Sequence, residues 1–360
     1  MVTTTRNNGY IVMGTMSGTS LDGLDLAICR FTRYRNKWNY KLLKSRTVAY
    51  SPDIRKKLEN SHFLSGQGII ALDNEFGYFI GRQSKAFIDE TGLNVSLICS
   101  HGHTVYHQPD KGLTFQAGNG ACIAAITGIT TVSDFRRTDV ALAGQGAPLV
   151  PAGDELLFSG YDYCLNLGGF ANISFRSGNQ RIAFDICPVN FILNLLARRK
   201  GKIFDKDGIN GASGKIDNSL LRRLNELDFY KADPPKSLGR EWIEHVFLPA
   251  MDKFDLPVID KMRTVYEHIA KQIGLIPEAD KTVLITGGGV HNKFLIDLIK
   301  RYCRAECIIP DDKTADFKEA IIFAFLGLLR VRNEVNCLAS VTGASRDSCC
   351  GVISLGTDYN

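Results

Sequence analysis

The amino-acid sequence predicts an α/β protein built from two domains. Segments with strand-like patterns alternate with helix-like segments, which is typical of βαβ units and a mostly parallel sheet. The order strand, small-residue loop, strand occurs at residues 11–31 and returns at 161–175, so the two halves open alike. A length of 360 residues also exceeds one typical core. We therefore expect domains over residues 1–135 and 136–360, with a return of the C-terminal tail to the first domain left open.

Composition and charge narrow the class of protein. Hydrophobic residues make up 44% and charged residues 22%, as in ordinary soluble enzymes, and the net charge of +5 is small for this length. No long run of Lys and Arg occurs, which argues against a nucleic-acid partner. The longest apolar run, 320–329, is about half of what a membrane-spanning helix needs, which argues against a membrane partner. Ten cysteines without paired spacing and a polar N-terminus predict reduced thiols and a cytoplasmic location.

The first strand–loop–strand segment carries residues suited to binding phosphate. Its apolar strand, 11–13, gives way to a loop, 14–23, made mainly of glycine, serine, threonine and aspartate, and a strand of alternating apolar residues follows from Leu24. Glycines let the backbone approach a ligand closely, and consecutive backbone N–H groups form an anion-binding concavity. The alternative is an ordinary Gly/Ser hairpin turn, but the return of the pattern later in the chain favours a phosphate site.

The rest of the first half reads as alternating strands and helices. We expect a strand or two over 38–50, helices over 54–64 and 69–91, a buried strand over 95–99, a strand at 114–116, a helix over 121–127 and a strand over 129–133. Polar residues 100–107 follow the strand at 95–99 directly, at the strand end where ligands of open α/β sheets sit. The spacing of His101, His103 and His107 invites a zinc interpretation, but only His101 and His103 would share a face of an extended segment. Polar lining of a cleft is therefore favoured over a metal site.

Residues 141–151 are rich in small residues and proline and have no periodicity. We interpret them as the crossing between the two halves, and such crossings often line a cleft. The second half then opens with a strand over 161–167, a break at Gly168 and Gly169, and a strand over 170–175.

A single acidic residue stands at a strand–helix junction in the second half. A strand over 181–186 carries Asp185 near its C-terminal end, and a helix follows Pro188. A carboxylate at this junction points into the predicted cleft, and the alternative is that Asp185 only caps the helix. Lys236 and Arg240, in a later turn that leads into a helix, are cations expected close to any anion in the cleft.

Residues 206–215 are rich in glycine and fail the Walker pattern twice. Ile209 replaces the first glycine of that pattern, and Ile216 replaces the Ser or Thr that holds magnesium. We therefore expect a glycine-rich surface loop here.

The last pattern is a strand over 282–285, three glycines at 287–289 and a helix from Asn292. The glycines let a planar base or a phosphate lie against the backbone. A dinucleotide-binding fold is the competing interpretation, because the outer two glycines supply G-x-G and Asp311 follows at about the right distance. The third glycine of that pattern is Asn292, however, which weakens this interpretation. The chain closes with an apolar helix over 317–330, which carries Glu319, and an irregular tail over 336–351.

This organisation resembles that of the sugar kinase, actin and Hsp70 superfamily. The resemblance implies an α/β, two-domain actin-like ATPase fold of the ribonuclease H-like type, with the active-site cleft between the domains. In that superfamily two hairpin tips hold the ATP phosphates from opposite sides, and the late three-glycine element holds adenosine. Fold alone does not give a reaction, and the motifs here are more specific than the fold.

The chain closely resembles the anhydro-N-acetylmuramic acid kinase family over nearly its whole length. So many separated matches in one order are not expected by chance. The matching segments are MSGTSLDGLD at 16–25, HGHTVYH at 101–107, FQAGNGACIAAITGI at 115–129, SDFRRTDVALAGQGAPLVP at 133–151, NLGGFANIS at 166–174, PKSLGRE at 235–241, TGGGVHN at 286–292, KEA at 318–320 and SVTGASR at 340–346.

The resemblance implies a homodimeric kinase that uses ATP and Mg2+ on 1,6-anhydro-N-acetylmuramic acid, a product of cell-wall (peptidoglycan) turnover. Water opens the anhydro bridge at C1 while the freed O6 receives the γ-phosphoryl group, which gives N-acetylmuramic acid 6-phosphate. The family's general base is the aspartate of a strand-end FD motif, and Phe184 and Asp185 occupy that place. Activating water for attack on an anomeric carbon needs an ionised carboxylate with a free lone pair.

The resemblance also implies roles for other residues. The first loop would contact the β- and γ-phosphates, with Asp22 holding magnesium through water, and the glycines of the second half would meet the phosphates and adenosine. Thr104, Arg136 and Glu319 are the expected sugar contacts, and Arg136 suits the lactyl carboxylate because it is a planar, charged donor. The residues expected to bind ATP are Gly18, Thr19, Ser20, Leu21, Asp22, Gly23, Leu24, Asp25, Gly168, Gly169, Gly287, Gly288 and Gly289.

Some residues depart from the family pattern. Cys187 and Val189 stand where glycines are usual after the catalytic aspartate, and we expect them to narrow the site or change its preference. His103 replaces a common glutamine, and Asn119 stands where aspartate is frequent. Three alternatives stay open: a kinase of a related sugar, a metal-dependent hydrolase that uses the three histidines, and a nucleotide sensor that closes on ATP without transferring phosphate.

Overall fold

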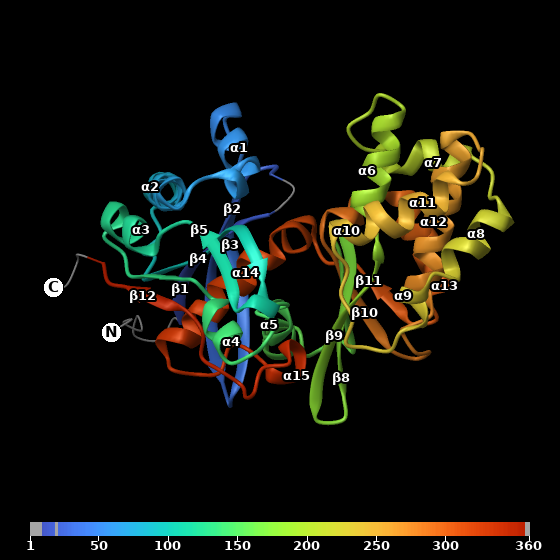
Figure 1. Ribbon diagram of the computed structural model, residues 1–360. Coiled ribbons are helices and arrows are strands. Elements are labelled where there is room, and N and C mark those ends of the chain that lie inside the picture. Colours follow the sequence, from blue (N-terminus) through green and yellow to red (C-terminus); the bar gives the residue numbers. More distant parts are fainter. Residues whose placement is uncertain (1–8, 19–20, 357–360) are drawn as a thin grey trace. The chain divides into compact units, whose positions relative to one another are not determined.

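The computed structural model of the protein describes residues 9–18 and 21–356, which form two units (Figure 1). Unit 1 contains the described residues up to Phe158 and those from Phe317 onward, and unit 2 is Ser159–Asp316. Thr19 and Ser20, two of the predicted phosphate contacts, lie outside the described residues.

Unit 1 is built on a mixed sheet of seven strands. These are β1 (Tyr10–Ser17), β2 (Leu24–Tyr34), β3 (Lys37–Val48), β4 (Leu97–Gln108), β5 (Leu113–Ala117), β6 (Thr131–Ser133) and β12 (Val352–Ser354). Their order is β12-β6-β4-β1-β2-β3, and β5 pairs with β4. Strands β1, β2 and β3 are antiparallel neighbours, whereas β4 runs parallel to β1 and β6 runs parallel to β4.

Unit 2 repeats this arrangement. Its strands are β7 (Tyr163–Leu167), β8 (Phe170–Ser177), β9 (Gln180–Pro188), β10 (Thr282–Thr286) and β11 (Glu306–Ile308). Their order is β11-β10-β7-β8-β9, with β7, β8 and β9 antiparallel and with β10 parallel to both β7 and β11. The same order and directions occur in β6-β4-β1-β2-β3 of unit 1. Two units with this topology confirm the predicted fold class, a two-domain actin-like fold of the ribonuclease H-like type.

Helices connect and cover the strands. Unit 1 contains α1 (Pro52–Glu59), α2 (Gly66–Thr91), α3 (Gly120–Thr127), α4 (Arg137–Ala141), α5 (Val150–Leu157), α15 (Ala339–Thr342) and most of α14 (Asp312–Val331). Unit 2 contains α6 (Asn190–Arg199), α7 (Ile209–Ser213), α8 (Asn218–Asn225), α9 (Asp228–Lys231), α10 (Arg240–Trp242), α11 (Leu248–Asp252), α12 (Val258–Gly274) and α13 (Lys293–Tyr302). Short helical turns are η1 (Ser61–Phe63), η2 (Pro109–Lys111), η3 (Lys206–Gly208), η4 (Ile243–Phe247) and η5 (Gly288–His291). Among the described residues, no helix has both the length and the apolar composition that crossing a membrane requires.

Helix α2 covers the face of the unit 1 sheet to which the apolar side chains at every second position of β2 point. Leu24, Leu26 and Ile28 of β2 are fully buried, and they share one core with Phe76 and Ile80 of α2. This burial explains the apolar–polar alternation seen in the sequence, because side chains at every second position of a strand face the same side.

Helix α14 packs on the opposite face of the same sheet. A side chain at Gly14 of β1 would place its Cβ 1.8 Å from the carbonyl oxygen of Ala320 in α14, so only glycine allows this close approach. Met13, the neighbour of Gly14 in the strand, belongs to the α2 core, so α2 and α14 cover opposite faces. The packing brings Glu319 of α14 close enough to Asp25 of β2 for their charges to interact.

The two units differ from the predicted domains 1–135 and 136–360, because residues 136–158 and the residues from Phe317 onward belong to unit 1. Residues 136–158 belong to unit 1, so the segment 141–151, interpreted as a crossing between halves, lies inside this unit. The cause is a buried carboxylate: Asp139 accepts hydrogen bonds from the Gly146 N–H at 2.7 Å and from Thr342 Oγ1 at 2.8 Å. The C-terminal tail does return to unit 1, where β12 pairs with β6 and extends the sheet.

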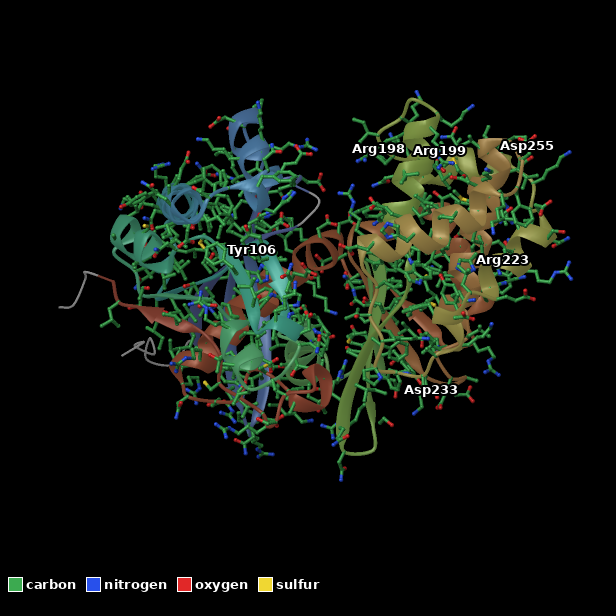
Figure 2. All side chains as sticks on the ribbon, in the orientation of Figure 1. Tyr106, Arg198, Arg199, Arg223, Asp233 and Asp255 are labelled. Carbon is green, nitrogen blue, oxygen red and sulfur yellow. The ribbon has the colours of Figure 1, made fainter. Side chains whose placement is uncertain are left out.

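Unit 2 has its own hydrophobic core between its sheet and α6, α12 and α13. Tyr266 of α12 is among its largest fully buried side chains. Several charged side chains of this unit lie on the outer surfaces of its helices, as Figure 2 shows for Arg198 and Arg199 of α6 and for Arg223 of α8.

Candidate active site

The loop after β1 places glycines and an exposed carboxylate at one end of the unit 1 sheet. The Leu21 N–H donates to the Gly18 carbonyl oxygen at 3.3 Å, and Leu21 has a φ of +57°. Asp22, the next residue, is exposed. A side chain at Gly23 would place its Cβ 2.6 Å from the Val48 carbonyl oxygen, so glycine is needed where β2 begins beside β3. An exposed carboxylate in such a turn is a suitable oxygen ligand for a hydrated divalent cation.

A buried chain of hydrogen bonds supports the residue that precedes this loop. The Tyr50 hydroxyl donates to Ser17 Oγ at 2.6 Å, and Ser17 Oγ lies 3.0 Å from His103 Nδ1. Burial lowers the pKa of His103 to about 4, so the imidazole is neutral near pH 7. The His103 ring also lies edge-on to Phe76 of α2, with 6.4 Å between the ring centroids. His103 therefore supports the start of the loop after β1 from within the core.

Leu24 and Asp25, also predicted to contact ATP, are the first residues of β2. The Leu24 side chain is fully buried in the α2 core, so only its backbone is available to a ligand. The Asp25 carboxylate accepts a hydrogen bond from Thr47 Oγ1 of β3 at 2.6 Å.

Arg136 is held in place by His101, a contact that sequence reasoning missed. Its Nε and Nη2 donate to His101 Nε2 at 3.0 and 2.8 Å, and its Nη1 donates to the Gly146 carbonyl oxygen at 2.6 Å. His101 Nδ1 donates to the Gly102 carbonyl oxygen at 3.0 Å, which leaves Nε2 as the acceptor. Burial, followed by the charge of Arg136, holds the pKa of His101 well below its ordinary value, so the ring stays neutral. The spacing of the three histidines was the only sequence signal at this position, and it indicated polar lining of a cleft but no contact with Arg136.

Glu319 completes a charged group in unit 1. Burial raises the pKa of Glu319, the charge of Arg136 opposes that rise, and the charge of Asp25 adds to it. Burial also lowers the pKa of Arg136 to about 10, and Glu319 provides the largest opposing effect. The structure thus brings together two of the three predicted sugar contacts, Arg136 and Glu319. The third, Thr104, is half-buried on β4 opposite Gln116 of β5.

The prediction that His101 and His103 share a face of their strand is wrong. Gly102, between them, has a φ of +73°, and the pairing of β4 with β1 shifts register at this point. As a result the His101 ring packs on Phe323 of α14, with 4.5 Å between ring centroids, whereas the His103 ring faces Phe76 of α2. The two imidazoles lie on opposite faces of the sheet.

The third histidine of the motif, His107, also has a partner of its own. Its Nδ1 lies 3.1 Å from Thr114 Oγ1 of β5. Across residues 9–18 and 21–356, no three His, Cys, Asp or Glu side chains are grouped so as to hold a metal ion. These contacts give no support to a zinc-dependent hydrolase.

Unit 2 brings the two predicted glycine loops together at the carboxyl ends of β7 and β10, which pair in parallel. A side chain at Gly287, where φ is +85°, would place its Cβ 2.4 Å from Asn166 Oδ1. One at Gly289 would place its Cβ 2.6 Å from Leu167 Cβ. Gly288 is exposed, and an added Cβ there would meet no atom within 4 Å. The outer glycines therefore pack against the end of β7, and the middle one presents open backbone to a ligand.

The other glycine loop is fixed to the start of α6. The Gly169 carbonyl oxygen accepts hydrogen bonds from the N–H groups of Val189 at 2.8 Å and Phe191 at 3.2 Å, and the Gly168 carbonyl oxygen accepts one from Asn190 at 3.2 Å. Gly169 is exposed and has no side chain to block a ligand. The loop is thus rigidly placed beside the strand that carries the acidic residue described next.

Asp185 lies half-buried near the end of β9 and is held by the segment that precedes α10. Its backbone N–H donates to the Lys236 carbonyl oxygen at 3.0 Å, and its Oδ2 accepts the Leu238 N–H at 2.8 Å. Burial raises the pKa of Asp185 to about 6, and the hydrogen bond from Leu238 opposes the rise. The alternative of a helix cap is not supported, since α6 has no side-chain cap at its first turn. The Leu238 contact was missed, because a backbone donor leaves no signal in a sequence.

Cys187 and Val189, the two bulky residues that follow Asp185, are buried in the unit 2 core. The pairing of β8 with β9 shifts by one residue, so Ile186 is an extra residue of a β-bulge. As a result Ile186 and Cys187 both lie in the unit 2 core, with 3% and 0% of their surface exposed, and Val189 is also 0% exposed. The expectation that Cys187 and Val189 narrow the site therefore fails for their side chains.

Lys236 and Arg240, the cations expected near the ligand, are bonded within their own segment. Lys236 Nζ donates to the carbonyl oxygens of Phe229 at 3.1 Å and Ala232 at 2.8 Å. Arg240 Nε forms an ion pair with Glu244 at 2.6 Å. The segment acts on Asp185 through backbone groups rather than through these charges.

The competing dinucleotide interpretation depends on Asp311 and Asn292, and both are used as helix caps. The Asp311 carboxylate accepts hydrogen bonds from the Thr314 N–H at 3.1 Å and Thr314 Oγ1 at 2.7 Å. Asn292 Oδ1 accepts the Leu295 N–H at 3.1 Å at the start of α13. A carboxylate committed to capping α14 is poorly placed to bind a ribose, so this interpretation is not favoured.

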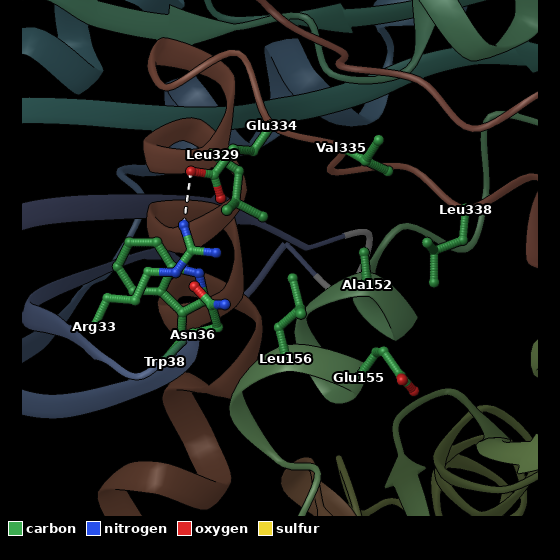
Figure 3. A pocket seen from close by; sticks show the side chains of 10 residues that line it. All are labelled: Arg33, Asn36, Trp38, Ala152, Glu155, Leu156, Leu329, Glu334, Val335 and Leu338. Atoms are coloured by element: carbon green, nitrogen blue, oxygen red, sulfur yellow. Dashed lines mark hydrogen bonds and ion pairs between the residues drawn. The ribbon is translucent and has the colours of Figure 1, made fainter.

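A cavity of about 250 Å³ lies elsewhere in unit 1 and contains none of the predicted site residues (Figure 3). It lies by the turn between β2 and β3, at the opposite end of β2 from the loop that joins β1 to β2. Inside it, the Arg33 guanidinium pairs with Glu334 at 3.0 Å and lies 5.3 Å from the centre of the Trp38 ring. The lining residues are Arg33, Asn36, Trp38, Ala152, Glu155, Leu156, Leu329, Glu334, Val335 and Leu338.

A family model and two curated relatives that match this chain carry the same name. The family model for anhydro-N-acetylmuramic acid kinase matches residues 10–356. The protein of that name from Synechococcus elongatus is 36% identical over 365 residues, which cover 93% of this chain and 96% of the relative. The one from Vibrio cholerae is 33% identical over 365 residues, which cover 95% and 98%. Among solved structures, a ROK family glucokinase from Streptomyces griseus in complex with glucose and AMPPNP covers 88% of this chain and 98% of its own length, at 12% identity and a TM-score of 0.41.

Proposed function

The chain belongs to the anhydro-N-acetylmuramic acid kinase family, and on that premise we propose that it converts 1,6-anhydro-N-acetylmuramic acid and ATP into N-acetylmuramic acid 6-phosphate and ADP. The enzyme is a kinase, a phosphotransferase that acts on a sugar hydroxyl. Its role is the recycling of peptidoglycan. The reaction couples two events, the hydrolytic opening of the anhydro bridge and the phosphorylation of O6.

The geometry of Asp185 is the observation that carries this proposal. One carboxylate oxygen is occupied by the Leu238 N–H at 2.8 Å, and the other is left to accept a proton from water. A pKa of about 6 makes this carboxylate a stronger base than an ordinary aspartate, yet leaves it ionised at neutral pH. Asp185 takes one proton from water as the water oxygen bonds to C1. The electron pair of the breaking C1–O6 bond then stays on O6, which attacks the γ-phosphorus, and ADP leaves.

The lactyl carboxylate of the sugar is assigned to Arg136. Three of its five N–H groups are used by His101 and the Gly146 carbonyl oxygen, which leaves two for a carboxylate. A guanidinium fixed in this way loses little further freedom when it binds the sugar, so the contact is preorganised. Burial raises the pKa of Glu319, and this residue is assigned to a sugar hydroxyl. Thr104 remains the third proposed sugar contact.

ATP is assigned to the loop after β1 and to the glycine loops of unit 2. Gly168 and Gly169 carry no side chains and are proposed to meet the phosphates, whereas the open backbone at Gly288 suits the adenosine side. Asp22 fits a hydrated Mg2+, because it is an exposed carboxylate within the phosphate loop. The ion would neutralise charge on the phosphates. The proposal requires loops of both units to act on one ATP molecule.

A product assay tests the proposed function. The purified protein is incubated with ATP and Mg2+, with and without the anhydro-sugar, and ADP and sugar phosphate are measured. Equal amounts of the two products, formed only with the sugar, are expected. ADP release that ignores the sugar would contradict the proposal and favour an ATPase, and no ADP release at all would favour a nucleotide sensor. Transfer to N-acetylglucosamine, which lacks the anhydro bridge, would instead favour a kinase of a related sugar.

We also propose a homodimer that works in the cytoplasm. All ten cysteines are free thiols, which suits a reducing compartment. Light scattering after size-exclusion chromatography should give twice the mass of one chain, and the mass of a single chain would contradict the dimer.

A further inference from the structure

The glycine-rich segment 205–213, which fails the Walker pattern, is folded around a buried carboxylate. Asp205 is only 4% exposed. Its Oδ1 accepts hydrogen bonds from the Asn210 N–H at 3.0 Å and from Asn210 Nδ2 at 2.8 Å. Its Oδ2 accepts the Gly211 N–H at 3.0 Å and the Tyr266 hydroxyl at 3.1 Å. Four hydrogen bonds use the full accepting capacity of a carboxylate, so this segment has one preferred arrangement.

The segment is packed tightly on α12 and α13, in addition to its hydrogen bond with Tyr266 of α12. A side chain at Gly211 would place its Cβ 2.2 Å from the Tyr266 ring, and one at Gly208 would place its Cβ 2.5 Å from Phe294 Cβ. Gly208 also has a φ of +71°, which other residues rarely adopt. The glycines thus serve close packing against these two helices and not the binding of phosphate.

Tyr266 connects this segment to the three-glycine loop. Its hydroxyl donates to Asp205 and accepts a hydrogen bond from Asn292 Nδ2 at 2.7 Å. Tyr266 is fully buried, and burial raises the pKa of its hydroxyl, so the donated proton is retained at all ordinary pH values. The chain of contacts therefore has a single direction, from Asn292 through Tyr266 to Asp205.

Asn292 stands at the end of the 287–289 loop and uses all its polar groups. Its backbone N–H donates to the Gly289 carbonyl oxygen at 3.1 Å, and its Oδ1 accepts the Leu295 N–H at 3.1 Å. With Nδ2 bonded to Tyr266, the residue joins the glycine loop, the first turn of α13 and the buried carboxylate.

We propose that Asp205, Tyr266 and Asn292 are positioning residues that hold the 287–289 loop in the conformation that binds the adenosine side of ATP. This inference rests on the proposed function, because that function assigns the loop to adenosine. None of the three needs to touch the nucleotide. Their effect reaches it through the backbone of the glycine loop.

Tyr266→Phe is the test, because it removes one hydroxyl and keeps the ring that fills the core. We expect the KM for ATP and the Kd of a non-hydrolysable ATP analogue to rise about tenfold, as for the loss of a buried hydrogen bond. The KM for the sugar and kcat at saturating ATP should stay within about twofold of the wild-type values. Asp205→Asn, which keeps the side-chain shape but replaces one acceptor oxygen with a donor group, should raise the same two constants.

Tyr302→Phe is the matched control. Tyr302 is the last residue of α13, and its hydroxyl donates to Glu267 of α12, so this variant loses a bond between the same two helices. It lies about 15 Å along the helix from Asn292, at 1.5 Å per residue. It should lower the melting temperature without changing the Kd of the ATP analogue.

Three outcomes would overturn the inference. An unchanged Kd of the ATP analogue in Tyr266→Phe would show that the contacts among Asp205, Tyr266 and Asn292 do not position the loop. An equal rise of this Kd in Tyr302→Phe would mean that the effect comes from a general weakening of helix packing. A wild-type protein that fails to bind the ATP analogue would overturn both the inference and the proposed function. A wild-type protein that binds the analogue but does not phosphorylate the sugar would contradict the proposed function alone. The Kd values of the wild type and the variants for the analogue would still decide whether Asp205, Tyr266 and Asn292 position the loop.

Discussion

Replacing Asp185 with asparagine should make the protein more stable at neutral pH and almost inactive. Burial raises the pKa of Asp185 from 3.8 to about 6. A difference of about 2 in pKa corresponds to about 3 kcal/mol of unfolding free energy. Because the folded protein binds this proton more tightly than the unfolded chain, the contribution to stability is full below pH 3.8 and is lost as the pH rises through about 6. Asparagine is neutral at every pH, and its Oδ1 can still accept the Leu238 N–H.

Urea unfolding at two pH values measures this effect. Relative to wild type, Asp185→Asn should gain about 3 kcal/mol at pH 8 and about half of that at pH 5, where the wild-type carboxyl group is already mostly protonated in the folded protein. ADP release should fall by about 10² to 10⁴ at pH 8, the usual contribution of a general base, while binding of an ATP analogue is retained. A gain in stability with a loss of activity is the expected signature of a residue kept for chemistry rather than for folding.

A surface aspartate of the same unit provides the control. The Asp228 side chain is 99% exposed, so Asp228→Asn should change stability by less than about 0.5 kcal/mol and leave turnover unchanged. The reasoning is refuted if Asp185→Asn is less stable than wild type at pH 8, or if it releases ADP at the wild-type rate.

Three more predictions concern the other parts of the site. Because protonated Asp185 cannot act as a base, kcat/KM should fall about tenfold for each pH unit below about 6, and a flat profile of ADP release between pH 5 and 8 would contradict this role. Arg136→Lys should raise the KM for the sugar about 100-fold and leave the KM for ATP unchanged, because an ammonium cannot reproduce the fixed fork of donors; equal sugar KM values would refute the assignment. Gly287→Ala should lower the free energy of unfolding, measured in urea, by about 1–3 kcal/mol, since the φ of residue 287 is +85° and an added Cβ would lie 2.4 Å from Asn166 Oδ1. Gly288→Ala should lower it by less than about 0.5 kcal/mol, because an added Cβ there meets no atom within 4 Å. Equal losses in the two variants would count against this packing.

Much of the fold could be predicted from local patterns. The alternation of Leu24, Leu26 and Ile28 indicated a half-buried strand. These three side chains are fully buried on one face of β2, but Ala27 and Cys29 on the other face are also 0% exposed, so both faces are covered there. The position of Asp185 at a strand end and the glycines at 287–289 indicated where ligands could meet backbone. Such signals are readable because they depend on residues close together in the chain.

The errors came from backbone irregularities that reverse the direction of side chains. The bulge at Ile186 turns Cys187 into the core, although strict alternation would have put Cys187 on the same face as Asp185. In the same way Gly102 sends His101 and His103 to opposite faces of the sheet. A period of two cannot reveal the position of an extra residue.

Long-range polar contacts were the other hidden feature. Asp139 accepts a hydrogen bond from Thr342, 203 positions later, and this bond keeps the 141–151 segment in unit 1. The backbone N–H of Leu238 holds the carboxylate of Asp185, 53 positions earlier. No local pattern marks either contact, because each depends on the complete tertiary structure.

Turnover of ATP and the anhydro-sugar in ¹⁸O-labelled water tests the coupled reaction most directly. If Asp185 activates water for attack on the anomeric carbon, mass spectrometry of the freshly quenched product should find one ¹⁸O atom on C1 of the sugar phosphate. The phosphoryl group of that product should carry no label from water. Label found instead in inorganic phosphate would mean that water attacks the γ-phosphorus, and the proposed hydrolysis at C1 with transfer to O6 would be wrong.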